Sequence, residues 1–341
     1  MRFSIIMPVC NSESYVNKGI MSIVNQTYNN WELIIIDDGS KDNTYNVCKK
    51  MIFDSRIKLF RINNSGPSYA RNYGLDKSDG DYILFLDSDD YFEVNALDIL
   101  KKEIEKNNSE IIFFPNYTDK YKNNNYIIEK NNSIKELIYE NNSDLRKDFI
   151  NLFQYSYIYP VWNKVYSRKI IKKFNARFPE SIKFAEDLVF NMKIYPYIEK
   201  AQIINKVLYH YVSRESESIT TSFNINRFEQ INTMYNFCII ILKKWCPESV
   251  NFFSNNYILE ISVCMNNLFN KDSILKRKER RRFIKQIVND ICVRAVIKET
   301  SLIGRRNILI GNLIMYHQIS LLYIIAKLSR KYNSFFLFLK G

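Results

Sequence analysis

The residues best suited to chemistry stand where a short apolar run gives way to carboxylates. Residues 82–86 are apolar and favour β-structure, and Asp87, Asp89 and Asp90 follow almost at once. In an extended backbone positions i and i+2 project to the same side, so the carboxylates of Asp87 and Asp89 can converge on one point. Carboxylates held that close repel one another unless a cation lies between them. A hard divalent cation that also binds phosphate oxygens suits the pair, whereas the alternatives are a solvated acidic loop and a helix N-cap at Asp90.

The elements that must position these carboxylates alternate between strand and helix. Apolar runs predict strands at 3–9, 32–36, 57–62 and 82–86, with helices between and after them at 14–25, 42–52, 67–75 and 94–106. Continuous apolar strands interleaved with helices are typical of an α/β fold whose sheet is largely parallel. Ligands of such folds bind beyond the carboxyl ends of the strands, which is where Cys10, Asn11, Asp38, Asn64 and Asp87 fall.

The regular alternation ends near residue 110. We expect a strand at 111–115, a hairpin or loop at 116–132, helix over 133–155, strand character at 203–212 and helices at 228–244, 250–269 and 274–299. The stretch 308–326 carries no formal charge and is nearly long enough to cross a bilayer, but polar residues interrupt it. We therefore expect a helix that lies in the membrane interface, with cations at its two ends, namely Arg305, Arg306, Lys327, Arg330 and Lys331.

Charge divides the chain into two parts. The net charge is +13, and residues 224–341 hold 19 of the 49 Lys and Arg but only 7 of the 36 Asp and Glu. A nearly neutral part, 1–223, followed by a basic helical part, 224–341, predicts a catalytic domain and a second region that binds an anionic surface. The six cysteines are scattered without a CxxC pair, and the first residues lead straight into a strand. We therefore expect a reducing, cytoplasmic location without a signal peptide.

Six motifs follow one another along the first two thirds of the chain. They read Ile-Ile-Met-Pro-Val-Cys-Asn at 5–11, Ser-Ile-Val-Asn-Gln-Thr-Tyr at 22–28, Leu-Ile-Ile-Ile-Asp-Asp-Gly-Ser-Lys-Asp-Asn-Thr at 33–44, Gly-Pro-Ser-Tyr-Ala-Arg-Asn at 66–72, Asp-Ser-Asp-Asp at 87–90 and Phe-Ala-Glu-Asp-Leu-Val-Phe-Asn at 184–191. In type and order they resemble family-two glycosyltransferases of the branch that builds bacterial capsule, lipopolysaccharide and related polysaccharides. The resemblance extends to about residue 220. It implies the GT-A fold and inverting transfer of a sugar from a nucleotide-diphosphate donor.

The resemblance assigns donor-side roles to residues at the strand ends. Asp38 resembles the acid that reads the nucleobase, and Asp89 resembles the acid that binds Mn²⁺ or Mg²⁺. A divalent cation there stabilises the charge that develops on the diphosphate as the glycosidic bond breaks. The alternatives are that Asp38 only caps a helix and that Arg71 only pairs with a surface acid. The remaining donor-pocket positions are Pro8, Asn64, Arg71, Asp87 and Ser88, of which the last two lie near ribose and phosphate.

Inversion also requires a base on the opposite face of the sugar, which removes the proton of the attacking acceptor hydroxyl. Asp187 resembles this base, being the Asp of the family's Glu-Asp pair, and Glu186 is expected to orient the acceptor. The alternative is that both acids only complement the dipole of a helix that begins there. Trp162, in Trp-Asn-Lys, resembles an acceptor-side motif whose indole stacks on sugar, although tryptophan is more often part of a core.

Residues 208–220 resemble the family's loop that folds over the diphosphate. Arg214 is followed there by Ser-Ile-Thr at 218–220, at a spacing that departs slightly from the family's. The resemblance implies that Arg214 binds the donor and that His210 is a metal ligand. The alternative is that His210 only packs within the fold, as a single histidine usually does.

These observations predict an inverting hexosyl- or N-acetylhexosaminyltransferase. Its donor is expected to be a UDP-sugar, and its acceptor a saccharide, lipid-linked, at the inner face of the cell membrane, where the basic region makes a peripheral contact. The rival is a nucleotidyltransferase or nucleic-acid-binding protein that uses the basic cluster 276–282. Nucleic-acid binders interleave aromatic residues or present a recognition module, and this cluster does neither. A polybasic segment beside apolar helices suits anionic lipid at least as well, so we expect no nucleic acid partner.

Overall fold

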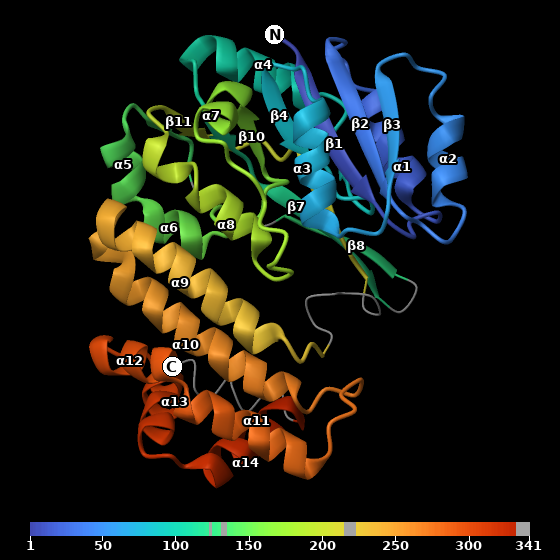
Figure 1. Ribbon diagram of the computed structural model, residues 1–341. Helices are drawn as coiled ribbons and strands as arrows, with labels where there is room; N and C mark the ends of the chain where they lie inside the picture. Colours follow the sequence, from blue (N-terminus) through green and yellow to red (C-terminus); the bar gives the residue numbers. More distant parts are fainter. Residues whose placement is uncertain (123–124, 131–134, 215–222, 332–341) are drawn as a thin grey trace. The chain divides into compact units, whose positions relative to one another are not determined.

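The computed structural model divides the chain into two compact units, residues 1–217 and 218–341. It describes residues 1–122, 125–130, 135–214 and 223–331 (Figure 1). The predicted boundary after residue 223 lies a few residues from the observed one. Catalysis by the first part and membrane association of the second stay predictions.

The first unit is built on an eight-stranded sheet. Its four parallel strands on one side are β3, β2, β1 and β4, and farther along β6 and β11 are parallel to each other, whereas β10 and β9 run antiparallel to their neighbours. The mostly parallel α/β sheet that we predicted is thereby confirmed. In spatial order the strands are β3 (Ile57–Ile62), β2 (Trp31–Asp38), β1 (Phe3–Val9), β4 (Tyr82–Phe85), β10 (Lys164–Ser167), β6 (Ile111–Phe113), β11 (Ala201–Ile203) and β9 (Leu137–Tyr139).

The residue types explain the centre of this sheet. Every residue of β2 is buried, and β1 is buried except for Pro8, as continuous apolar runs in a covered sheet require. Proline lacks an N–H and is normally excluded from central strands. It is tolerated at position 8 because the pairing of β1 with β4 ends at Ile6 and Phe85, so a donor at residue 8 would find no strand on that side.

Helices connect the strands of the first unit. α3 packs on β1 and β2, and a Cβ added at Gly74 would lie only 2.4 Å from the Cγ2 of Ile6. This close packing requires glycine, and it sets how deeply Arg71, one turn earlier in α3, is buried. The helices are α1 (Val16–Val24), α2 (Thr44–Lys50), α3 (Pro67–Lys77), α4 (Ala96–Asn107), α5 (Asn142–Lys147), α6 (Phe149–Gln154), α7 (Arg168–Lys173), α8 (Glu186–Met192) and the 3-10 turn η1 (Tyr195–Tyr197).

A second sheet of four strands stands beside the first. Its spatial order is β5 (Tyr91–Phe92), β12 (Tyr209–Arg214), β7 (Asn116–Lys122) and β8 (Asn125–Lys130). β7 and β8 pair antiparallel, which confirms the hairpin expected there. The N-cap alternative for Asp90 is wrong, because β5 follows this residue and the N-cap of α4 is Asn95.

Two expectations for this unit need correction. Residues 133–155 were predicted as helix, but Leu137–Tyr139 forms the edge strand β9, because pairing with β11 overrides local preference. The strand character at 203–212 belongs to two strands, β11 and β12, which lie in different sheets.

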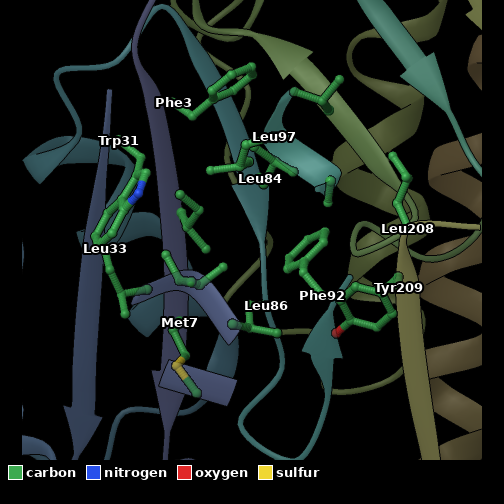
Figure 2. Packing of buried hydrophobic residues seen from close by; sticks show 14 of the residues in the cluster. Phe3, Met7, Trp31, Leu33, Leu84, Leu86, Phe92, Leu97, Leu208 and Tyr209 are labelled. Carbon is green, nitrogen blue, oxygen red and sulfur yellow. The ribbon is translucent and has the colours of Figure 1, made fainter. Parts of the chain in front are cut away.

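A cluster of buried apolar side chains supports the carboxylate-bearing loop after β4. Figure 2 shows part of this cluster, in which Leu84 and Leu86 lie near Phe92 of β5 and Tyr209 of β12. The rings of Phe92 and Tyr209 meet edge to face with centroids 4.9 Å apart. The core therefore holds β4, β5 and β12 together, and it fixes both ends of the loop 87–90.

The second unit is helical throughout its described elements, as predicted. They are α9 (Arg227–Trp245), η2 (Pro247–Ser249), α10 (Val250–Asn267), α11 (Arg277–Asn289), α12 (Ile291–Glu299), α13 (Arg305–Met315) and α14 (Ile319–Lys331). The helix predicted at 274–299 is divided, because the side chain of Asp290 accepts the N–H of Val293 at 2.9 Å and starts α12.

The single interfacial helix predicted at 308–326 is also divided. His317 adopts a left-handed conformation, and the N–H of Gln318 donates to the carbonyl of Leu313 at 2.8 Å. This is the Schellman pattern that ends a helix, so α13 and α14 form a hairpin. Over the described ranges, none of the helices has the length and apolar character needed to span a bilayer.

Candidate active site

The loops after β1, β2 and β3 meet at the carboxyl edge of the sheet. The sulfur of Cys10 lies 3.5 Å from the carbonyl oxygen of Asp38. The buried carboxylate of Asp38 accepts the N–H groups of Ser65 at 2.6 Å and of Gly66 at 2.7 Å. Asp38 therefore does not cap α2, which was the alternative, and instead binds the loop that leads into α3. The strand ends come together as the α/β pattern predicted.

Gly39 and Asn64 explain how these loops approach so closely. Gly39 has φ +69°, and a Cβ there would lie 2.9 Å from the backbone nitrogen of Asn64. A side chain at position 39 would be excluded both by conformation and by space. Asn64 is exposed at this contact, and Pro8 is half-buried at the end of β1.

The loop 87–90 places its three acids in different surroundings. Asp87 accepts from the guanidinium of Arg71 at 2.9 Å, and Asp89 lies farther along the loop, half-buried. The hydroxyl of the intervening Ser88 is 2.8 Å from that of Ser12 in the loop after β1. Asp90 is buried, and it accepts from the Tyr209 hydroxyl and from the Val212 N–H, both at 2.8 Å. Asp90 therefore ties the loop to β12.

Arg71 joins the carboxyl edge of the sheet to a distant part of the chain. Besides Asp87, its guanidinium contacts Glu186 at 3.3 Å and Asp187 at 3.2 Å. Arg71 is buried and these three partners are carboxylates, so it does not pair merely with a surface acid, which was the alternative. The structure thus brings together four of the predicted site residues across more than a hundred positions of sequence.

Asp187 lies in the first turn of α8, and the backbone before it is strained. Ala185, the N-cap of α8, has φ +59°, a left-handed conformation that non-glycine residues rarely adopt. Such conformations persist where the surroundings impose them, and they gather at functional sites. One oxygen of Asp187 contacts Arg71, the other accepts the N–H of Val161 at 3.2 Å, and the side chain remains 20% exposed.

The electrostatics of this cluster suit a base that works near neutral pH. Burial raises the pKa of Asp187 to about 7, and the charges of Glu186 and Asp87 act in the same direction. The charge of Arg71 and the N–H of Val161 oppose the shift but do not cancel it. A general base is most effective when its pKa lies near the working pH.

The segment that supplies the Val161 N–H is held by residues that the sequence did not single out. The ammonium of Lys164 is fully buried and donates to the carbonyl of Pro160 and, at 2.7 Å, to the side chain of Asn163. Burial lowers the pKa of Lys164 well below its usual range. The amide of Asn191 donates to the carbonyls of Ile158 and Tyr159. A lysine inside the apolar run Val-Trp-Asn-Lys-Val-Tyr was the available signal.

Trp162 packs within this part of the protein. Its ring stacks on Tyr209, with centroids 4.9 Å apart, and on Tyr211, with centroids 5.6 Å apart. The indole thus links the Val161 segment to β12, and the stacking of Trp162 on an acceptor sugar stays a prediction.

The hydrogen-bond partners of His210 lie outside the loop 87–90. Its Nδ1 lies 3.0 Å from the carboxylate of Asp119 and its Nε2 lies 2.8 Å from that of Glu93, while its ring stacks on Tyr91. Alternation along β12 directs His210 to the face opposite Tyr209, which is the residue that contacts Asp90. Both ring nitrogens of His210 are engaged by carboxylates in this structure, and its role as a metal ligand stays a prediction.

Arg214 is the last residue of β12, where it pairs with Tyr121. The rest of the segment predicted to fold over the diphosphate, including Ser-Ile-Thr at 218–220, lies outside the described residues. The donor role of Arg214 stays a prediction.

The carboxylates of the loop fit a divalent cation only in company with phosphate. Within the described ranges, no three His, Cys, Asp or Glu side chains are grouped so that they could hold a metal ion. Mg²⁺ and similar ions are commonly bound by one or two carboxylates, with phosphate oxygens and water completing the shell. Asp89, together with Asp87, is a donor set of that kind.

Comparison with known proteins identifies, for the first unit, the family that the six sequence motifs resemble. Residues 4–174 match the family model described as glycosyl transferase family 2. The chain is 26% identical over 309 residues to glycosyltransferase EpsJ of Bacillus subtilis, which covers 87% of this chain and 86% of EpsJ. It is 53% identical over 103 residues to a glycosyltransferase of Haemophilus influenzae, which covers 30% of this chain but only 40% of that protein.

Solved structures extend the likeness to nearly the whole chain. The crystal structure of S. aureus TarS 1–349 in complex with UDP-GlcNAc aligns with a TM-score of 0.68 at 20% sequence identity, covering 97% of this chain and 92% of the TarS 1–349 chain. At that identity the likeness concerns the fold alone, and it confirms the predicted GT-A fold with its helical C-terminal region.

Proposed function

The chain belongs to glycosyl transferase family 2, and we propose that it moves a sugar from a UDP-sugar to a saccharide hydroxyl with inversion at the anomeric carbon. The UDP-sugar is suggested by TarS, which was solved with UDP-GlcNAc. Hexosyl or N-acetylhexosaminyl transfer into a bacterial surface polysaccharide, such as capsule or lipopolysaccharide, fits this donor. The competing nucleotidyltransferase and nucleic-acid readings have no such support.

The observation that carries the proposal is the carboxylate of Asp187, held by Arg71 and by the Val161 N–H with its pKa raised to about 7. In the proposed step the acceptor hydroxyl attacks the anomeric carbon, and its proton passes to the carboxylate of Asp187. The new bond forms on one face of the sugar while the bond to the diphosphate breaks on the other, so the configuration inverts. Glu186, which contacts the same Arg71 guanidinium as Asp187, orients the acceptor. Trp162 offers an aromatic surface on which the acceptor sugar can stack.

The donor is assigned to the carboxyl edge of the sheet. Asp38, the last residue of β2, is the proposed partner of the nucleobase, and Pro8 and Asn64 are assigned to the same pocket. Asp87 and Ser88 are assigned to ribose and phosphate, and Arg214 to the diphosphate. Arg71 acts as a positioning residue, because it orients Asp87 and Asp187 through direct contacts.

Asp89, with Asp87, would hold a divalent cation, Mn²⁺ or Mg²⁺, when phosphate oxygens complete the shell. Such a cation supplies positive charge where negative charge develops on the leaving diphosphate, without the need for a proton donor. The residues of the loop contribute independently of it: Ser88 and Ser12 hold the loop against the end of β1, and Asp90 holds it against β12.

We propose further that the acceptor is lipid-linked and that the protein works on the cytoplasmic face of the membrane. The support is the basic composition of residues 224–341, which suits a peripheral contact with anionic lipid.

A donor screen tests the proposal. The full chain is incubated with UDP-, GDP- and TDP-sugars and Mn²⁺, and slow donor hydrolysis is measured. We expect UDP release, and we expect Asp38→Asn to raise the KM for the donor by about tenfold, the worth of one hydrogen bond to a charged group. Hydrolysis of GDP- or TDP-sugars alone would overturn the UDP assignment, and no hydrolysis or nucleotide binding at all would overturn the function.

A further inference from the structure

The helical hairpin α13–α14 turns apolar side chains to solvent. Ile308 and Leu309 of α13 are 44% and 37% exposed, and Leu321 and Ile324 of α14 are 47% and 50% exposed. Tyr316, in the turn between the helices, is 74% exposed. Single exposed apolar residues are ordinary on protein surfaces, but a group of five on adjacent elements marks an interaction site.

These side chains share the outward side of the hairpin. α13 and α14 contact each other, and both pack on α10 (Figure 1). Their buried positions, Ile310 and Ile314 of α13 and Leu322 and Ala326 of α14, face that packing. Leu321 and Ile324, three positions apart, form one stripe along α14, whereas Ile308 and Leu309 are consecutive in α13, and none of the four belongs to the buried positions that pack on α10.

Cations border the apolar surface. Arg305 and Lys327 are exposed on the hairpin itself. The guanidinium of Arg281 in α11 donates to the Ser320 hydroxyl at 3.0 Å and lies over the ring of Tyr323, so α11 flanks α14. α11 carries further exposed cations, and no Asp or Glu follows Glu299 in the sequence.

We infer that this outer face of α13–α14, with the flanking cations of α11, docks on the anionic headgroups of a lipid bilayer. The exposed apolar side chains enter the boundary between headgroups and acyl chains, and the cations contact lipid phosphates. A second copy of the chain would be a poorer occupant, because a symmetric contact places like charges opposite one another. The inference deepens the proposed function by naming the surface through which the enzyme meets a lipid-linked acceptor.

Vesicle binding by the full chain tests the surface. The probes are vesicles of phosphatidylglycerol and phosphatidylcholine in equal parts, and vesicles of phosphatidylcholine alone. We expect binding to the anionic vesicles that weakens as salt rises. Arg305→Gln with Lys327→Gln should weaken it about 25-fold, since each cation near an anionic surface contributes about fivefold. Leu321→Gln with Ile324→Gln should weaken it by about tenfold or more through lost apolar contact.

Matched controls lie on α9 of the same unit. Lys243→Gln with Lys244→Gln removes two exposed cations, and Ile240→Gln removes an exposed isoleucine, away from the hairpin. We expect each to change binding less than twofold. Equal losses in controls and hairpin variants, or binding unaffected by either, would overturn the inference. So would a dimer in sedimentation experiments that only the hairpin variants dissociate. Donor hydrolysis in solution requires no membrane, so a failure here leaves the proposed sugar transfer standing and removes only the proposed membrane contact.

Discussion

The donor edge of the sheet and the surroundings of Asp187 are built in different ways. At the donor edge each residue stands at the end of its own strand, and the loops are joined by short contacts such as those between Asp38 and the N–H groups of Ser65 and Gly66. Asp187 depends instead on groups from separate parts of the chain: Arg71 from α3, and Val161 from a segment braced by Lys164.

In the proposed function, this difference would separate donor binding from proton transfer. The donor edge offers backbone and carboxylate groups whose positions follow from the sheet, which suits the recognition of a nucleotide. The Asp187 cluster has a buried cation, three carboxylates and a raised pKa, which suits proton transfer. Arg71 belongs to both regions. Variants on the two sides should therefore have different kinetic signatures.

Asp187→Asn should show the largest difference between its effect on turnover and its effect on donor binding. The substitution keeps size and removes the base, so kcat should fall by about 10²–10⁴-fold while the KM for the donor barely changes. Steady-state transfer and nucleotide binding by calorimetry measure the two effects. Glu186→Gln is the matched control, because it alters the same Arg71 contact and should affect the acceptor KM more than kcat. A kcat near the wild-type value for Asp187→Asn would place the base elsewhere.

Substitution of Asp89 should affect both turnover and donor binding, since the metal proposed there would act in both. We expect Asp89→Asn to lower kcat by about 10²–10³-fold and to weaken metal-dependent donor binding as well. Chelation by EDTA should silence the wild-type enzyme, and added Mn²⁺ should restore it. Circular dichroism verifies that the variant is folded. Full activity in chelator would remove the metal from the proposal.

The pH dependence should also differ between the two regions. Because the base must be ionised, and burial raises the pKa of Asp187 in the free enzyme to about 7, kcat/KM should fall about tenfold for each pH unit below 7 and be level above it. Donor binding should tighten only slightly as the pH rises through 7, because it releases less than one proton. The residual activity of Asp187→Asn serves as the reference and should lose this slope. A slope that survives in the variant would assign the titration to another group.

The smallest effect on kcat is expected from Lys164, which only supports the segment that contacts Asp187. Lys164→Met removes the donor to the Pro160 carbonyl, and an unsatisfied buried acceptor costs about 1–3 kcal/mol of unfolding free energy. With the Val161 segment loosened, kcat should fall less than about tenfold and the pH profile should shift. Lys169→Met, at an exposed position of α7, is the control. If Lys164→Met lowers stability and leaves the pH profile unchanged, Lys164 only supports the fold.

The donor edge was largely predictable because its contacts are local to the strand ends. The runs 3–9 and 57–62 predict β1 and β3 to the residue, and parallel strands bring their carboxyl ends to one edge. The roles expected for Asp38, Asp87 and Asp187 came from the family resemblance. That resemblance did not predict the hydrogen bonds and ion pairs around these residues.

The Asp187 cluster and the second sheet were less predictable because long-range contacts decide them. Nothing near Arg71 in sequence announces a carboxylate 116 positions away. The contacts of His210 could not be predicted either, because its partners, Asp119 and Glu93, come from distant parts of the chain. The break at His317 depends on a turn that composition alone does not distinguish from continuing helix.

One guanidinium shared by three carboxylates has a thermodynamic consequence. A donor that engages Asp87 draws its charge away from the cluster, and Arg71 is then shared by Glu186 and Asp187 alone. Both changes lower the affinity of Asp187 for its proton, because Asp87 raises the pKa of that carboxyl and Arg71 lowers it. Donor binding near pH 7 should therefore release a fraction of a proton, visible as a binding enthalpy that varies with the ionisation heat of the buffer. If the proposed roles hold, a bound nucleotide would make Asp187 easier to deprotonate before the acceptor arrives.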